Sequence, residues 1–263
     1  MSFSAAWLSL REPFDRRARN PAVLQAVAAA FAGLPSVNIA DLACGTGSTL
    51  RALGPRIAAR QHWRLYDNDL SLLARAADVP NATAVPVDLA RDLEVALDGP
   101  VDLVTTSALL DLVSAEWLER LAIETAARRI PVYAALTYDG RAEFTPSDPL
   151  DDKIVAAVNA HQRSDKGFGP ALGPTAAQAA VEQFERVGYT VLQGAADWSF
   201  ETADREIQTE ILSGWAAAAR EMGTVPLPDV LAWLTRRNVF VAAGLSSIRV
   251  GHVDVFARPA AAR

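Results

Sequence analysis

The stretch VNIADLACGTGSTLRAL, Val37 to Leu53, decides the fold. An apolar run reaches Asp41, a turn with two glycines follows, and a helical pattern begins at Ser48. A strand, a glycine-rich turn and a helix in this order typically form the ligand-binding unit of a doubly wound α/β sheet. The unusual feature is a carboxylate so close to the bare backbone of the turn, and it limits which ligand can bind.

Outward from this stretch, β-rich runs alternate with helical patterns. Such alternation predicts βαβ units and a parallel sheet with helices on both faces. Ser114 is the expected N-cap of a helix over 114–129, with Glu116 in its first turn. Asp69 is the expected N-cap of a helix over 70–78. The predicted strands lie at 37–43, 62–67, 82–89, 101–109, 132–138 and 189–195.

The rest of the chain extends this core into one predicted domain over residues 1–263. We expect N-terminal helices in 1–35, a core in 36–139, a loop-rich cover segment in 140–173 with one helix, and a C-terminal core with a helical insertion in 174–263. The alternation in the closing stretch RVGHVDVFARP predicts a last strand that is antiparallel to its neighbour. We expect the arginines of LREPFDRRARN (10–20) to form a solvated helix face rather than an anion site, with closure of this segment over the ligand as the lesser alternative.

Composition excludes several classes of function. The net charge of −6 and the pI near 5.2 argue against a broad nucleic-acid footprint, which needs a basic face. The single cysteine, Cys44, cannot form an intrachain disulfide, and the chain shows no signal-peptide pattern and no membrane-spanning apolar run. We therefore expect a cytoplasmic protein that does not bind membranes. The three histidines have no metal-site spacing.

Three ligands suit a strand, glycine turn and helix. ATP or GTP through a P-loop needs a lysine that GTGST lacks. A dinucleotide fingerprint needs a third glycine where Leu50 stands, and Asp41 would repel the pyrophosphate. S-adenosylmethionine carries a sulfonium and an ammonium but no phosphate, so Asp41 favours it. Asp67 then ends the second strand, where a carboxylate can accept from ribose hydroxyls, and Asp88 ends the third, near the adenine.

At this point the sequence resembles a family. The segments DLACGTGS, LYDNDLSLL, VPVDLA and DLVTTSALLDLVS resemble, in order and spacing, the successive motifs of class I S-adenosylmethionine-dependent methyltransferases, over about residues 37–138. The resemblance implies a Rossmann-like, doubly wound, seven-stranded mixed sheet whose last strand is antiparallel, with helical insertions. It also implies S-adenosylmethionine at the carboxyl ends of the first strands. The residues expected to bind it are Asp41, Ala43, Cys44, Gly45, Gly47, Asp67, Asn68, Asp88, Leu89 and Ser107.

The methyl acceptor is less well marked. Asp111 follows the fourth strand, where relatives place polar residues near the acceptor, although it could equally be a helix-start carboxylate. The stretch NAHQRSDKGFGPALGP (159–174) carries His161 and several glycines, and we expect it to cover the acceptor rather than form an ordinary solvated loop. We therefore name His161 and Asp111 as candidate catalytic bases, and Arg163 and Lys166 as candidate substrate-binding residues.

The predicted function is methyl transfer to an oxygen or nitrogen of a small molecule, with S-adenosylmethionine as cofactor. One alternative is a methyltransferase that acts on a protein or an RNA. Another, of a different class, is a non-catalytic module that binds S-adenosylmethionine. The sequence gives neither the acceptor nor the oligomeric state.

Overall fold

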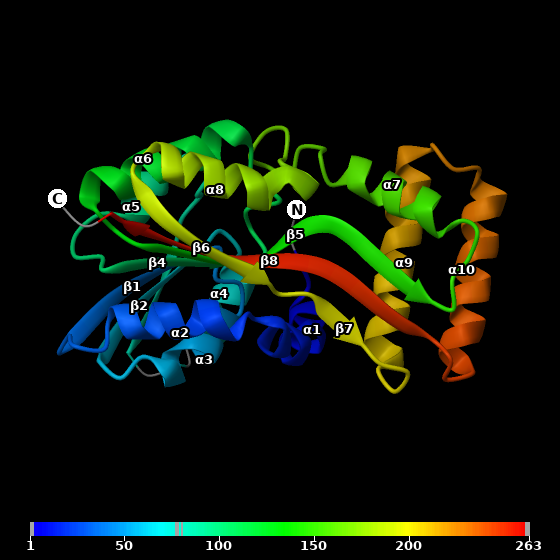
Figure 1. The fold of residues 1–263 in the computed structure, drawn as a ribbon, viewed down its shortest axis with the longest axis horizontal. Helices are drawn as coiled ribbons and strands as arrows, with labels where there is room; N and C mark the ends of the chain where they lie inside the picture. The colour runs from blue at the N-terminus through cyan, green and yellow to red at the C-terminus, as the bar shows by residue number, and fades with distance from the viewer. Residues whose placement is uncertain (1–2, 77–78, 80, 261–263) are drawn as a thin grey trace.

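The computed structural model describes residues 3–76, 79 and 81–260. In these residues eight strands form one sheet, with seven of them in the order β3-β2-β1-β4-β5-β8-β6 (Figure 1). Strands β1 to β5 pair in parallel, whereas β8 is antiparallel to β5 and to β6. The strands are β1 Ser36–Leu42, β2 Arg60–Asp67, β3 Ala82–Pro86, β4 Leu103–Ser107, β5 Val132–Thr145, β6 Tyr189–Ala195, β7 Trp198–Phe200 and β8 Ser247–Pro259.

This topology confirms the expected doubly wound mixed sheet with its antiparallel last strand. The structure also contains a short strand, β7, which pairs with residues 248–250 at the start of β8. The predicted extent of a single domain over 1–263 stays a prediction, and its first two and last three residues lie outside the described part of the chain. No helix within 3–76, 79 and 81–260 has both the length and the apolar character needed to cross a membrane.

Helices cover both faces of the sheet. Helices α5, α6 and α8 lie on one face, and α2 and α3 lie on the other (Figure 1). Two apolar cores fill the layers between helices and sheet. The helices are α1 Ala5–Ala18, α2 Pro21–Ala30, α3 Ser48–Leu53, α4 Leu70–Ala76, α5 Leu93–Ala96, α6 Ala115–Arg128, α7 Asp151–His161, α8 Ala176–Arg186, α9 Arg205–Met222 and α10 Leu227–Ala242.

The predicted helix starts follow from capping. The Ser114 hydroxyl accepts from the Trp117 amide at 3.2 Å, so it caps α6 as expected, and Glu116 lies in the first turn. The Asp69 carboxylate accepts from the amide of Ser71 at 2.9 Å, which fixes the start of α4. Residues 77 and 78, the predicted end of that helix, lie outside the described residues.

Strands β5 and β8 form a long antiparallel pair that extends beyond the central sheet (Figure 1). Two register shifts in β5, with Leu136 at a φ of 55°, mark bulges that increase the local bend. Beyond them the pair packs against α7, α9 and α10 around a third apolar core. Because β5 runs to Thr145, the expectation of loop from residue 140 was wrong: Arg141 and Glu143 are polar because they occupy the solvent face of a strand.

Candidate functional site

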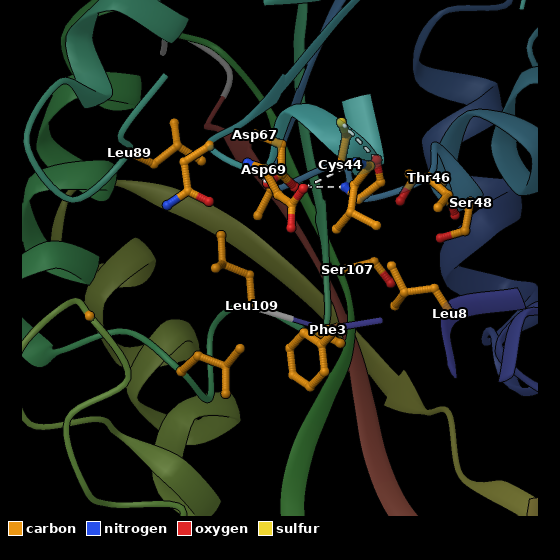
Figure 2. A pocket seen from close by; sticks show the side chains of 18 of the residues that line it. Phe3, Leu8, Cys44, Thr46, Ser48, Asp67, Asp69, Leu89, Ser107 and Leu109 are labelled. Atoms are coloured by element: carbon orange, nitrogen blue, oxygen red, sulfur yellow. Dashed lines mark hydrogen bonds between the residues drawn. The ribbon is translucent and has the colours of Figure 1, made fainter. Parts of the chain in front are cut away.

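A pocket opens at the carboxyl ends of β1, β2 and β4, between the glycine turn and helix α1 (Figure 2). It encloses about 1210 Å³ not filled by protein atoms, including its open mouth. Ligands of open α/β sheets bind at this edge. Most of the predicted cofactor residues line the pocket, namely Ala43, Cys44, Gly45, Asp67, Asn68, Asp88, Leu89 and Ser107.

The turn after β1 presents backbone to the pocket. Gly45 has a φ of +55°, and a Cβ placed on it would lie 3.3 Å from Leu8 Cδ1 of α1. Ala43 adopts a φ of 51°, which is costly for a residue with a side chain, and Cys44 is buried with its pKa raised by desolvation. Gly47 is placed differently, because it caps α3 and faces Ala76 rather than the pocket.

Asp67 connects the end of β2 to this turn. One carboxylate oxygen accepts from the Gly45 amide at 2.9 Å, and the other accepts from the Asp69 amide at 3.0 Å. Figure 2 shows Asp67 beside Cys44 at the pocket. Asp88, after β3, is exposed and accepts from the Ala90 amide at 3.1 Å. Two carboxylates on neighbouring strands therefore reach the same end of the pocket.

Asp41 lies fully buried beneath the turn and does not line the pocket. One oxygen accepts from the Thr105 hydroxyl at 2.7 Å, and the other, Oδ2, has no partner among the described residues. Burial raises the pKa of Asp41 to about 7, against the opposing effect of the Thr105 hydrogen bond. This carboxyl group is therefore sensitive to any positive charge that enters the site above it.

A buried arginine supports the floor of the pocket. Arg19 is 2% exposed and donates to the Ser107 hydroxyl at 3.3 Å, the Thr49 hydroxyl at 3.4 Å and the Tyr133 hydroxyl at 3.3 Å. Arg11 is also buried, so the reading of LREPFDRRARN as a solvated face was wrong at two positions. Of the four arginines in this stretch, only Arg16 and Arg17 are exposed.

The opposite wall comes from the N-terminal residues and from the predicted cover segment. Phe3 and Leu8 line the pocket from one side, and the segment 166–168 lines it from another. The Phe168 ring packs edge-to-face on Trp117 at 5.5 Å, and Trp117 Nε1 donates to the Leu89 carbonyl at 2.7 Å. The cover segment is thus tied to a residue at the predicted adenine end.

Backbone hydrogen bonds also anchor the cover segment. The Leu172 amide donates to the Val113 carbonyl at 2.8 Å, and the Gly173 amide donates to the Asp111 carbonyl at 2.9 Å. The end of the segment is therefore held against the turn that follows β4, and the contact fixes how residues 166–168 meet the pocket.

Of the candidate residues for the acceptor side, only one lines the pocket. Lys166 lines the pocket, and its pKa is lowered by burial. His161 and Arg163 are not among the lining residues; His161 Nε2 lies 3.2 Å from Glu221 of α9, and its Nδ1 lies 3.5 Å from Lys166 Nζ. Asp111 is buried behind the lining residues, and desolvation raises its pKa to about 6. The roles of all four stay predictions.

Comparisons with known proteins address the fold. No protein-family model matches the sequence, and no curated protein matches it significantly. Among solved structures, the chain is similar to a cyclopropane-fatty-acyl-phospholipid synthase-like protein from Lactobacillus casei, at 14% identity and a TM-score of 0.52, covering 94% of this chain and 98% of that one. The chain has the fold of class I S-adenosylmethionine-dependent methyltransferases.

Another protein with this methyltransferase fold is also similar. A methyltransferase from Thiobacillus denitrificans, solved with S-adenosylhomocysteine, matches at 14% identity with a TM-score of 0.45, covering 97% of this chain and 99% of that one. At these identities the likeness describes the arrangement of the chain, and the chemistry has to be argued from the site itself. Among the described residues, no cluster of histidine, cysteine and carboxylate side chains could hold a metal ion.

Proposed function

We propose that this protein is an S-adenosylmethionine-dependent methyltransferase that acts on an oxygen or nitrogen of a small molecule. One observation carries the proposal: at one edge of the pocket, a glycine backbone and a carboxylate lie together. Gly45 lines the pocket, and the Asp67 carboxylate accepts from the Gly45 amide at 2.9 Å. A cofactor with a ribose, no phosphate and two positive charges suits that pairing.

The buried groups beneath the turn also fit the cofactor. Asp41 Oδ2 is a fully buried carboxylate oxygen without a hydrogen-bond partner among the described residues. Its ionised form is costly, and the positive charges of Arg19 and Arg51 offset that cost only in part, because the pKa stays raised to about 7. A dinucleotide or nucleoside triphosphate would bring negative charge to the same place. The unpartnered oxygen therefore supports a cationic ligand over an anionic one.

The residues divide into two roles. S-adenosylmethionine, when bound, supplies a methyl group on a sulfonium that is already a good leaving group. The protein then has to orient the reactants and exclude water, which can account for most of the acceleration. The residues that we propose for the cofactor are Ala43, Cys44, Gly45, Asp67, Asn68, Asp88, Leu89 and Ser107 at the pocket, with Asp41 and Gly47 supporting the turn.

The acceptor side supports a small molecule. The pocket is walled by the N-terminal residues and by the cover segment, whose Phe168 is held by Trp117. An apolar surface of Phe3, Leu109, Leu112 and Phe168 lines the pocket together with Lys166. A neutral alcohol or a protonated amine would also need a base. Asp111 and His161 stay our candidates, the first through its raised pKa and the second through its contact with Lys166.

The first test is calorimetric titration of the protein with S-adenosylmethionine, which should bind. The second is incubation with S-adenosylmethionine and fractionated cell extract, with mass-spectrometric detection of S-adenosylhomocysteine. Product formation that needs only the small-molecule fraction supports the proposal. Product formation that needs protein or RNA fractions would favour the macromolecular alternative. Tight binding without product in any fraction would favour a non-catalytic module.

A further inference from the structure

Arg11 of α1 was expected on a solvated helix face, but it lines the pocket. Its side chain is 8% exposed, and its Nε lies 3.2 Å and 2.9 Å from the two carboxylate oxygens of Asp15. The guanidinium lies over the Trp198 ring, 5.0 Å from its centroid, and Trp198 Nε1 donates to Asp15 at 2.9 Å. One edge of the guanidinium is therefore fixed by an ion pair and by an aromatic face.

The two terminal nitrogens of Arg11 remain available. Across the described chain, neither Nη atom donates to a protein acceptor, and neither is a sealed, unpartnered atom like Arg19 Nε. Since Arg11 lines the pocket, these nitrogens are the groups that it can offer to a ligand. Two parallel N–H groups in one plane match the two oxygens of a carboxylate.

The charges along the pocket point the same way. Three lining carboxylates, Asp67, Asp69 and Asp88, come from the ends of β2 and β3, and a fourth, Asp15, comes from α1 and pairs with Arg11. The cations among the described lining residues are Arg11 and Lys166, from α1 and from the cover segment. The pocket thus offers carboxylates to hydroxyl and amino groups on one side, and a fixed guanidinium from α1.

We infer that Arg11 binds a carboxylate group of a ligand in this pocket. The inference rests on the proposed function, and the carboxylate has two possible sources. One is the amino-acid end of the cofactor, and the other is the acceptor, whose apolar body would pack on Leu109, Leu112 and Phe168.

The cofactor arm compares two nucleosides. S-adenosylhomocysteine carries the amino-acid carboxylate, whereas 5′-methylthioadenosine lacks the whole amino-acid end. If the cofactor supplies the carboxylate, Arg11→Ala and Arg11→Lys weaken S-adenosylhomocysteine binding by about ten- to a hundred-fold and leave 5′-methylthioadenosine binding unchanged. Arg16→Ala, which removes an exposed arginine of the same helix, is the control and changes neither. Unchanged 5′-methylthioadenosine binding also shows that the variant pocket is folded.

The acceptor arm uses the protein saturated with S-adenosylhomocysteine and a matched pair of probes, hexanoate and hexanamide, in ligand-observed NMR titrations. If the acceptor supplies the carboxylate, the wild type prefers hexanoate by about tenfold or more and the Arg11 variants lose this preference. The inference is overturned if neither arm depends on Arg11, or if both nucleosides weaken together in both Arg11 variants. A wild type that binds neither nucleoside overturns the proposed function. Titration of the free protein with hexanoate and hexanamide then tests by itself whether Arg11 binds a carboxylate.

Discussion

The two ends of the pocket are built in different ways. The predicted cofactor end is local in sequence: the turn at 43–47 and Asp67 follow adjacent, directly paired strands. The predicted acceptor end combines α1, the turn after β4 and the segment 166–168, which are far apart in the chain. Each end has a buried carboxyl group with an unpartnered oxygen, Asp41 below the first and Asp111 behind the second. The first end is a property of the sheet edge, whereas the second depends on how distant segments fold over it.

The largest effect is expected at the turn. Gly45→Val puts a branched side chain at a φ of +55° and within 3.3 Å of Leu8, so both backbone strain and lost space act together. Cofactor affinity should fall by more than about a hundredfold by calorimetry, and further than thermal stability falls. Gly33→Val is the control, because a Cβ there meets nothing within 4 Å. Normal binding by the Gly45 variant would mean that the ligand does not lie on this turn.

Asp67→Ala should have the next largest effect. It removes a charged acceptor at the cofactor end, so we expect a loss of about ten- to a hundred-fold in S-adenosylmethionine affinity. The variant also leaves the Gly45 amide without its 2.9 Å partner, so circular dichroism and the unfolding midpoint must be compared with the wild type. Asp98→Ala, at an exposed aspartate outside the pocket lining, is the matched control. An Asp67 variant that binds like this control would contradict the assignment.

The cofactor end shows what the sequence could predict. Asp41, Gly45 and Asp67 are marked by order along the chain, because consecutive parallel strands bring their carboxyl ends to one edge. The burial of Arg11 and Arg19 could not be seen, because it depends on Trp198, Tyr133 and the β8 strand far along the chain. Polar residues at 141 and 143 suggested a loop for a similar reason: a strand that pairs outside the central sheet keeps one solvent face.

The two buried carboxyl groups give a pH-dependent comparison. Burial raises the pKa of Asp41 to about 7, so the folded protein holds a proton that the unfolded chain releases near pH 4. The free energy of unfolding should therefore fall as pH rises from about 4 to about 7, and Asp41→Asn should remove this part, about 2 kcal/mol between pH 5 and pH 7. The pKa of Asp111 is raised to about 6, so this group also lowers the free energy of unfolding as pH rises from about 4 to about 6.

Urea unfolding of wild type, Asp41→Asn and Asp111→Asn at pH 5, 6, 7 and 8 measures these slopes. A bound cationic cofactor should lower the pKa of Asp41. Saturating S-adenosylmethionine should therefore reduce the contribution of Asp41 to the pH dependence of the free energy of unfolding more than it reduces the contribution of Asp111. Parallel pH curves for wild type and Asp41→Asn would show that this carboxyl group does not titrate in that window.

The smallest effect on the cofactor is expected at the acceptor end. His161 lies outside the pocket lining and reaches it through Lys166, 3.5 Å away. His161→Ala should therefore leave S-adenosylmethionine affinity within about twofold of the wild type. Turnover of the acceptor, once one is found, separates the two candidate bases. A catalytic base contributes about a hundredfold or more, whereas a residue that only holds Lys166 changes the acceptor Michaelis constant and little else.

We expect the larger loss of turnover in Asp111→Asn and the change in Michaelis constant in His161→Ala. The reason is their position relative to the pocket. Asp111 is the chain neighbour of the lining residue Leu112, whereas His161 contacts Glu221 of helix α9, outside the pocket lining. Lys166→Ala should reproduce the His161→Ala change if the histidine acts through the lysine, and the double variant should then add nothing. A hundredfold loss of turnover in His161→Ala, with Lys166→Ala nearly silent, would reverse the assignment and make the cover segment itself the source of the base.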